Sequence, residues 1–386
     1  MSAPSLSNVF FLYRDSPLRR AALAARSGAP ERYCLHGLDQ VAARGIAVGH
    51  NLERRPPPGW TRAADAVVNR IAYGAGGYGG DFASVLASLR VLNSADAVLS
   101  TVDTVGLPIA LLKRAGLVRP PLVYIAIGLP ERLAKLQRGR VRRLYASALG
   151  TAATIVAFGR REVEALDRWL RENGVSAPDV EFVPFGVDTT YFRPQPEVAP
   201  EFDVLSIGAD PHRDFGMLLR VAQRLRERSF RLVVSAEHAR TLGRAPANVS
   251  VEVDLPFSLV RDRLASARLV VLPVRENSYS GATTVLLQAL ATGKPVVVSR
   301  TGAIADGYGL SDGVNCRLVA PSDPAALEVA VRSLLEDGNT AARLAADARA
   351  TVERSLSWER YVEALYAILQ RAAESGSRGP DSASRR

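Results

Sequence analysis

The residues whose types and spacing best suit chemistry lie between Leu269 and Arg300. This stretch reads as a strand LVVLP, a polar loop RENSYSGATT, a helix VLLQALATG and a second strand KPVVVS. The residues expected to open the helix are Ser280, Gly281, Ala282, Thr283 and Thr284. Small side chains there let a phosphate approach unpaired N–H groups and the positive end of the helix dipole. The alternative is that Ser280 simply caps the helix.

Two further segments extend the pattern through the carboxyl-terminal half. Residues Phe182–Pro194 read FVPFGVDTTYFRP, and Leu205–Leu219 read LSIGADPHRDFGMLL, which predicts a strand, a tight turn and a helix. Together with Leu269–Arg300, and in this order, they resemble the family-4-type retaining glycosyltransferases of the GT-B fold. The resemblance covers essentially the whole carboxyl-terminal half and, more loosely, the amino-terminal half.

The resemblance implies a site for the diphosphate of a nucleotide-sugar donor. The loop after the first strand of the second domain would place Arg213 on the phosphates, with His212 beside it. A guanidinium binds two phosphate oxygens at once and offsets the charge of a departing leaving group. The alternative for Arg213 is an exposed helix-start residue paired with Asp214. Ala209 stands where relatives often carry a second basic residue, and Lys294 is expected to begin a strand.

The family's pair of glutamates, which has seven residues between them, is replaced here by Ser280 and Gln288. Gln288 is expected to accept hydrogen bonds from the ribose hydroxyls. Because Ser280 is short and neutral, Glu276 is an equal candidate for the sugar contact, the alternative being a solvated loop carboxylate. Gly186 is expected either to let the backbone approach the donor or to serve the geometry of a turn.

The amino-terminal half contains a glycine-rich stretch, YGAGGYGGD at Tyr73–Asp81. A dinucleotide fingerprint needs a strand just before it, whereas AVVNRIAY reads at least as well as a helix, which disfavours a nicotinamide site. We expect a glycine loop, with Gly76 and Gly77, at the edge of the acceptor site. Asp103 and Glu131 follow predicted strands and are expected at the mouth of that site. Glu131 is also explained by a helix start.

Two positions argue against a catalytic histidine. Many relatives place a histidine at the end of the strand that here reads VYIAIG, but this chain has Ile127 and Gly128. His36, in YCLHGLD, is expected to be a half-buried helix residue rather than a base.

Short β-branched runs alternate with amphipathic segments along the chain, a pattern typical of parallel sheets covered by helices. The series is too long for one sheet, and 386 residues exceed the usual size of one core. Prolines in 189–201 suggest a linker. We therefore predict an α/β protein with two doubly wound, Rossmann-like domains facing a central cleft. The ranges are 1–188 for the acceptor-binding domain, 189–201 for the linker, 202–357 for the nucleotide-sugar-binding domain, 358–371 for a helix and 372–386 for a disordered tail.

The net charge of +10 favours anionic partners. Six basic residues and no acid occur between Arg132 and Arg143: Arg132, Lys135, Arg138, Arg140, Arg142 and Arg143. They form either a solvated helix face or a patch for anionic lipid. Nucleic acid is disfavoured because no aromatic residues interleave with them. Cys34 and Cys316 are expected as reduced, buried residues. A cytoplasmic protein is expected, with peripheral attachment at the inner membrane surface as the alternative that a lipid-binding patch would imply.

The sequence hypothesis is a metal-independent, cofactor-free transfer of a sugar from a UDP- or GDP-sugar to an acceptor hydroxyl of a carbohydrate, lipid or small molecule, with retention of configuration. Arg213 and Glu276 are the catalytic candidates. Two alternatives remain: a non-catalytic GT-B-like partner subunit, and a sugar-nucleotide epimerase or phosphorylase on the same fold.

Overall fold

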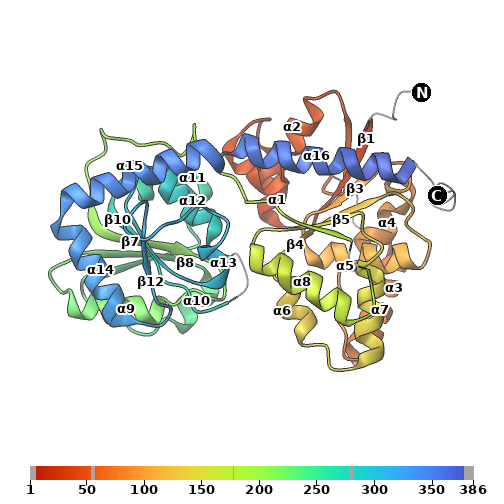
Figure 1. Ribbon diagram of the computed structural model, residues 1–386, viewed down its shortest axis with the longest axis horizontal. Helices are drawn as coiled ribbons and strands as arrows, with labels where there is room; N and C mark the ends of the chain where they lie inside the picture. Colours follow the sequence, from red (N-terminus) through yellow and green to blue (C-terminus); the bar gives the residue numbers. More distant parts are fainter. Residues whose placement is uncertain (1–5, 54–56, 177, 278–280, 378–386) are drawn as a thin grey trace. The chain divides into compact units, whose positions relative to one another are not determined.

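The computed structural model describes residues 6–53, 57–176, 178–277 and 281–377 (Figure 1). The chain divides into two compact units. Unit 1 comprises 1–183 together with 362–386, and unit 2 comprises Pro184–Tyr361. Each unit contains one six-stranded parallel sheet, so the predicted pair of Rossmann-like α/β domains is confirmed.

The sheet of unit 1 has the order β2-β1-β3-β4-β5-β6. Its strands are β1 (Asn8–Leu12), β2 (Ala47–His50), β3 (Ala97–Ser100), β4 (Leu122–Ala126), β5 (Thr154–Ala157) and β6 (Asp179–Phe182). The helices are α1 (Pro17–Ala24), η1 (Pro30–Leu35), α2 (Leu38–Ala42), α3 (Gly59–Gly74), α4 (Phe82–Leu92), α5 (Asp103–Arg114), α6 (Leu129–Ala134), α7 (Gly139–Leu149) and α8 (Arg160–Glu172). The central strands β3, β4 and β5 are wholly buried, as expected for parallel strands covered on both faces.

The sheet of unit 2 has the order β12-β11-β10-β7-β8-β9. Its strands are β7 (Phe202–Gly208), β8 (Phe230–Val234), β9 (Val249–Val253), β10 (Ala267–Leu272), β11 (Val296–Ser299) and β12 (Arg317–Val319). The helices are α9 (Phe215–Arg224), α10 (Ala236–Thr241), α11 (Phe257–Ala265), α12 (Thr283–Ala291), α13 (Gly302–Ala305), α14 (Pro324–Glu336) and α15 (Gly338–Ser355). Helix α16 (Trp358–Ser377) ends the described chain.

Each sheet has one point at which the order of its strands reverses. In unit 1, β2 lies on one side of β1, whereas β3 and the strands that follow it lie on the other side of β1. The order of the strands therefore reverses between β1 and β3. In unit 2 the reversal lies between β7 and β10 for the same reason. In doubly wound sheets, ligands bind beyond the carboxyl ends of the strands at such a point.

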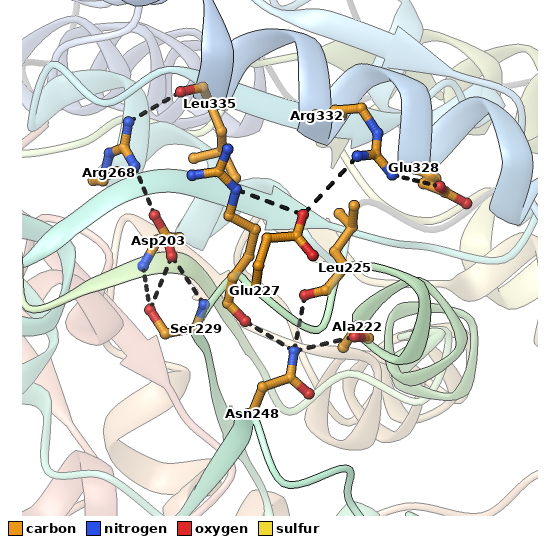
Figure 2. Close-up of polar contacts among 11 residues, drawn as sticks. Asp203, Ala222, Leu225, Glu227, Ser229, Asn248, Arg268, Glu328, Arg332 and Leu335 are labelled. Carbon is orange, nitrogen blue, oxygen red and sulfur yellow. Dashed lines mark hydrogen bonds and ion pairs between the residues drawn. The ribbon is translucent and has the colours of Figure 1, made fainter.

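The opposite, amino-terminal edge of the unit 2 sheet is closed by polar contacts (Figure 2). Asp203 Oδ2 accepts hydrogen bonds from Ser229 N at 2.9 Å and Ser229 Oγ at 3.1 Å, while Arg268 joins Asp203 Oδ1 (2.7 Å) to the carbonyl of Leu335 (3.0 Å). Asn248 Nδ2 donates to three carbonyl oxygens, those of Ala222, Leu225 and Arg228. These contacts involve residues at or just before the amino-terminal ends of β7, β8, β9 and β10. The carboxyl-terminal edge of the sheet is therefore the edge at which a ligand can bind.

The strands expected at LSIG, LVVLP, KPVVVS and VYIAIG are present in the structure as β7, β10, β11 and β4. Strand β2 was not predicted, because AVGH lacks a β-branched run. Gly49 within it pairs in register with Phe10, and a β-carbon at Gly49 would lie 2.8 Å from the Phe10 ring. Packing against Phe10 therefore requires glycine at position 49, and this glycine is one reason why the sequence does not show a typical strand pattern.

The segment 189–201, expected as a linker, lies inside unit 2. Arg349 of α15 donates hydrogen bonds to the carbonyl oxygens of Thr189 at 2.9 Å and Phe192 at 2.7 Å. The Phe192 ring also packs edge-on against Phe257, with centroids 5.9 Å apart. The proline-rich sequence here forms turns and irregular backbone within unit 2.

Helix α16 differs from the expected helix 358–371 and disordered tail 372–386. It continues to Ser377, and Ala372 and Ala373 are buried. A β-carbon at Gly376 would lie 2.5 Å from Pro121, so the end of the helix packs closely within unit 1. Residues 372–377 are helical because apolar contacts hold them.

Candidate functional site

The loop between β7 and α9 is shaped by two aspartates. Asp210 Oδ1 accepts a hydrogen bond from the N–H of His212 at 3.1 Å. Asp214 caps α9 by accepting from Met217 N at 2.9 Å. The loop therefore has a fixed path from the carboxyl end of β7 into the first turn of the helix.

Arg213 is buried in this loop, with 2% of its surface exposed. Its Nε donates to Asp210 Oδ2 at 2.7 Å, while its Nη1 is buried and has no hydrogen-bond partner among the described residues. Burial lowers the pKa of Arg213, and the charge of Asp210 opposes that shift. The alternative of an exposed arginine paired with Asp214 is wrong, since Asp214 caps α9. A buried guanidinium with an unsatisfied N–H is suited to receiving an anion.

The loops that follow β7 and β10 are bonded to each other at the reversal point. Asp214 N donates to the carbonyl of Pro273 at 3.0 Å, and Arg275 N donates to the carbonyl of His212 at 2.8 Å. Val274 N in turn donates to Ser299 Oγ at 3.0 Å, at the end of β11. The backbone that holds Arg213 is thus connected to the loop leading toward α12.

Helix α12 begins at Thr283, and its N-cap residue, Ala282, supplies no side-chain cap. Thr283 is 3% exposed, and its Oγ1 is buried without a hydrogen-bond partner in the described part of the chain. Ser280 lies outside the described residues. The first turn therefore presents backbone N–H groups, including those of Thr283 and Thr284, and one unsatisfied hydroxyl after the small residue Gly281.

Glu276 and Gln288 occupy different environments in unit 2. Glu276 is exposed in the loop after β10, and its Oε1 accepts from Gly302 N at 3.0 Å at the start of α13. Gln288 lies on α12 and is 4% exposed. Their roles toward a sugar and a ribose stay predictions.

In unit 1, a buried carboxyl group follows β3. Asp103 is 1% exposed, and its Oδ1 accepts from the Tyr124 hydroxyl at 3.0 Å and from Ile127 N at 3.3 Å. Its Oδ2 is 3.4 Å from Nε of Arg132. Burial raises the pKa of Asp103 to about 7, against the opposing effect of Arg132. Asp103 is thus enclosed by its contacts with Tyr124, Ile127 and Arg132, and its place at the mouth of an acceptor site stays a prediction.

A second buried carboxyl, Glu162 of α8, supports the same loop. It is fully buried, and its Oε1 accepts from Gly128 N at 2.9 Å. Burial raises the pKa of Glu162 to about 8, and the charge of Asp103 adds to that effect. The sequence analysis missed Glu162; the available signal was an acid in the first turn of a helix that directly follows a strand.

Comparisons with known proteins agree with this geometry. Residues 201–337 match the family model described as glycosyl transferases group 1. The chain is 29% identical over 213 residues to the MMP alpha-(1->4)-mannosyltransferase of Mycolicibacterium hassiacum, covering 53% of this chain and 51% of that protein. It therefore spans about half the length of that relative.

Two solved structures share the whole architecture. Sucrose-phosphate synthase from Thermosynechococcus elongatus superimposes with a TM-score of 0.70 at 15% identity, covering 94% of this chain and 98% of that one. Anabaena HepE, in complex with UDP and glucose, superimposes with a TM-score of 0.65 at 16% identity, covering 95% and 100%. The chain therefore has the GT-B fold, and residues 201–337 within unit 2 match the glycosyl transferases group 1 model. The narrower resemblance to retaining, family-4-type GT-B enzymes stays a prediction.

Within this GT-B chain, Gly186 has a packing explanation. A β-carbon there would lie 2.6 Å from the carbonyl oxygen of Ser357 and 2.9 Å from Tyr361 Cβ. Val187 N donates to the carbonyl of Leu356 at 3.0 Å, which fixes the turn. The geometry of this turn explains the glycine at position 186 without any contact to a nucleotide sugar.

The glycine-rich stretch of unit 1 follows a helix, α3, and not a strand, so the dinucleotide fingerprint has no structural basis. Gly76 has a φ of 79°, which favours glycine, and a β-carbon at Gly77 would lie 2.8 Å from the Tyr145 hydroxyl. Glu131 lies in the first turn of α6. Their roles toward an acceptor stay predictions.

Two other residues named in the sequence analysis have structural explanations. His36 is 5% exposed at the left-handed end of η1, and burial lowers its pKa to about 3, so it is a neutral ring and neither a base nor a helix residue. Lys294 lies just before β11 and not in it, and its Nζ donates to the carbonyls of Ala265 and Ala267.

Both cysteines, Cys34 and Cys316, are free and buried, as expected. Within the described residues there is no cluster of three or more potential metal-ligating side chains. No helix in the described ranges has the length and apolar character needed to cross a bilayer.

Proposed function

We propose that this protein transfers a sugar from a UDP- or GDP-sugar to an acceptor hydroxyl, with retention of anomeric configuration and without a metal or other cofactor. The observation that carries the proposal is the buried, incompletely bonded guanidinium of Arg213 at the reversal point between β7 and β10. Buried donors without partners are uncommon in folded proteins and are costly unless a ligand satisfies them.

The donor diphosphate is assigned to the N–H groups at the start of α12 and to Arg213, with His212 beside it. As the glycosidic bond breaks, negative charge builds on the β-phosphate. Donors fixed in advance stabilise this charge more strongly than the ground state. The positive end of the α12 dipole acts in the same direction.

The remaining roles follow from position. Gln288 is assigned to the ribose hydroxyls and Glu276 to the donor sugar, while unit 1 binds the acceptor near Glu131 and the Gly76–Gly77 turn. Asp103 and Glu162 are positioning residues, because they hold the backbone of Ile127 and Gly128 without being exposed.

The relatives support the chemical class of donor and acceptor. One is named as a mannosyltransferase, and the HepE structure contains UDP and glucose. These proteins point to a nucleotide-sugar donor and a carbohydrate acceptor for this chain as well.

A thermal-shift screen of the full chain against UDP, GDP, ADP, dTDP and their sugars tests the proposal. A ligand that binds the folded state raises the melting temperature. We expect one UDP- or GDP-sugar to raise it, and the same compound to be consumed only when an acceptor is added. Binding without any turnover would instead favour a partner subunit. Conversion of the sugar nucleotide without an acceptor would favour an epimerase, and phosphate-dependent conversion of a glycoside a phosphorylase.

A further inference from the structure

One helix of unit 1 presents apolar side chains to solvent. On α3, the side chains of Trp60, Val67 and Ile71 are 64%, 58% and 65% exposed. Their spacing of seven and four residues places them along one stripe of the helix. Tyr73, 63% exposed, lies at the end of the same helix. A cluster of large exposed apolar residues usually marks an interaction surface.

The opposite face of α3 is polar and is fixed to its own unit. Asp65 Oδ1 accepts hydrogen bonds from Phe82 N at 2.8 Å and Ala83 N at 3.3 Å. Asn69 exchanges two 2.9 Å hydrogen bonds with the backbone of Gly80. The usual amphipathic arrangement is thus inverted. Rotating the helix to bury its apolar stripe would break these bonds, so the stripe is held outward by the fold.

A basic cluster adjoins the carboxyl end of this helix. Arg138, just before α7, donates from Nη1 to the carbonyl of Gly74 at 3.3 Å, and Figure 1 shows α3 and α7 in the same part of unit 1. Lys135, Arg138, Arg140 and Arg143 are exposed, as are Arg62 and Arg70 on α3 itself. Within the described ranges, no acid forms an ion pair with Lys135, Arg140 or Arg143.

We propose that the α3 stripe and this basic cluster together dock unit 1 onto a bilayer that contains anionic phospholipid. Trp60, Val67 and Ile71 enter the interface between headgroups and acyl chains, where tryptophan and aliphatic side chains are favoured. The basic side chains contact lipid phosphates. Arginine and lysine side chains that form no ion pair within the protein are available to lipid phosphates. Anionic lipids diffuse within the bilayer and can move to these side chains. This docking is independent of the proposed transfer reaction, so either can fail without the other.

Vesicle sedimentation with the full chain tests the proposal. Wild-type protein is expected to bind vesicles of phosphatidylcholine mixed with phosphatidylglycerol, to bind pure phosphatidylcholine roughly tenfold less, and to be released by salt. Equal binding to both vesicles, or none to either, would overturn it.

Two variants separate the two parts of the surface. Val67→Asp is expected to reduce binding by roughly tenfold or more, since it places a charge in the apolar stripe. Its control is Val329→Asp, at a 67% exposed position on α14 in unit 2, which is expected to bind like wild type. Arg140→Glu combined with Arg143→Glu is expected to abolish the preference for phosphatidylglycerol. Its control is Arg226→Glu, exposed in unit 2.

Circular dichroism and sedimentation velocity exclude two other causes. The variants are expected to melt like wild type, because all of the substituted side chains are exposed. If wild type instead forms a dimer that Val67→Asp dissociates, and no vesicle binding is seen, the stripe binds a second copy of the chain and the lipid proposal is wrong.

Discussion

A β-carbon on Gly208 would overlap the guanidinium of Arg213, reaching its Nε and lying 2.9 Å from its Nη2. Gly208, the last residue of β7, therefore has to be a glycine for the guanidinium of Arg213 to occupy its observed position. Because Asp210 fixes the same guanidinium from the loop, it has no nearby position to move to without losing its ion pair.

Gly208→Ala is expected to displace Arg213 and to weaken nucleotide-diphosphate binding by roughly thirtyfold, since a charge-assisted hydrogen bond contributes about 2 kcal/mol. Gly216→Ala is the matched control, because a β-carbon there would meet nothing closer than 3.7 Å. Isothermal titration of both variants with UDP and GDP checks this. Equal affinities would show that the guanidinium does not bind the diphosphate.

The substitution Glu276→Gln distinguishes a catalytic role of Glu276 toward the donor sugar from a structural role toward Gly302 N. The amide oxygen of glutamine can still accept the hydrogen bond from Gly302 N. If the carboxylate contacts the donor sugar, turnover is expected to fall by roughly tenfold or more while affinity for the free nucleotide stays unchanged. Steady-state kinetics with the donor found by the thermal screen measures this. Unchanged turnover would leave Glu276 as a solvated loop residue.

Glu162→Gln is expected to change how stability depends on pH. The unfolded chain releases this proton near the ordinary glutamate pKa of 4.5, whereas burial raises the pKa in the folded protein to about 8. Folding stability from this group is therefore present at low pH and is lost as pH rises through that interval. The variant should show a smaller fall in melting temperature between roughly pH 5 and pH 8.

The control for that measurement is Glu164→Gln, an exposed position on the same helix. It is expected to keep the wild-type pH dependence. An identical profile for Glu162→Gln would mean that Glu162 is already ionised in the folded protein throughout this pH interval.

Asn248→Ala is expected to lower the free energy of unfolding by about 2 kcal/mol, because three carbonyl oxygens lose their donor. Nucleotide affinity is expected to stay unchanged, since this network lies at the amino-terminal edge of the sheet (Figure 2). Asn339→Ala, at an exposed position, is the control. Urea unfolding measures the effect. A loss of nucleotide affinity would show that the two edges of the sheet are coupled.

The alternation of strands and helices predicted the fold because each element carries its own local pattern. The site was predicted only in outline. Arg213 could be found from its motif, but its burial beside Asp210 depends on how the loops after β7 and β10 bond to each other. Glu162 has only the local signal of an acid in the first turn of a helix, and nothing local connects position 162 with the backbone of Gly128, 34 residues earlier.

The same limit explains the boundary between the units. Prolines in 189–201 predicted a linker, yet Arg349, more than 150 residues later, binds this segment to unit 2. Long-range hydrogen bonds of this kind have no signature in a local window of sequence.

The most direct test is calorimetric titration of the full chain with UDP and with GDP, for wild type, Arg213→Ala and the exposed control Arg226→Ala. Wild type and the control are expected to bind one of the two nucleotides with equal affinity, and Arg213→Ala to bind it roughly thirtyfold more weakly, as expected for the loss of about 2 kcal/mol. Equal affinity in all three proteins, with each shown to be folded, would contradict the assignment of the diphosphate to Arg213 and the start of α12.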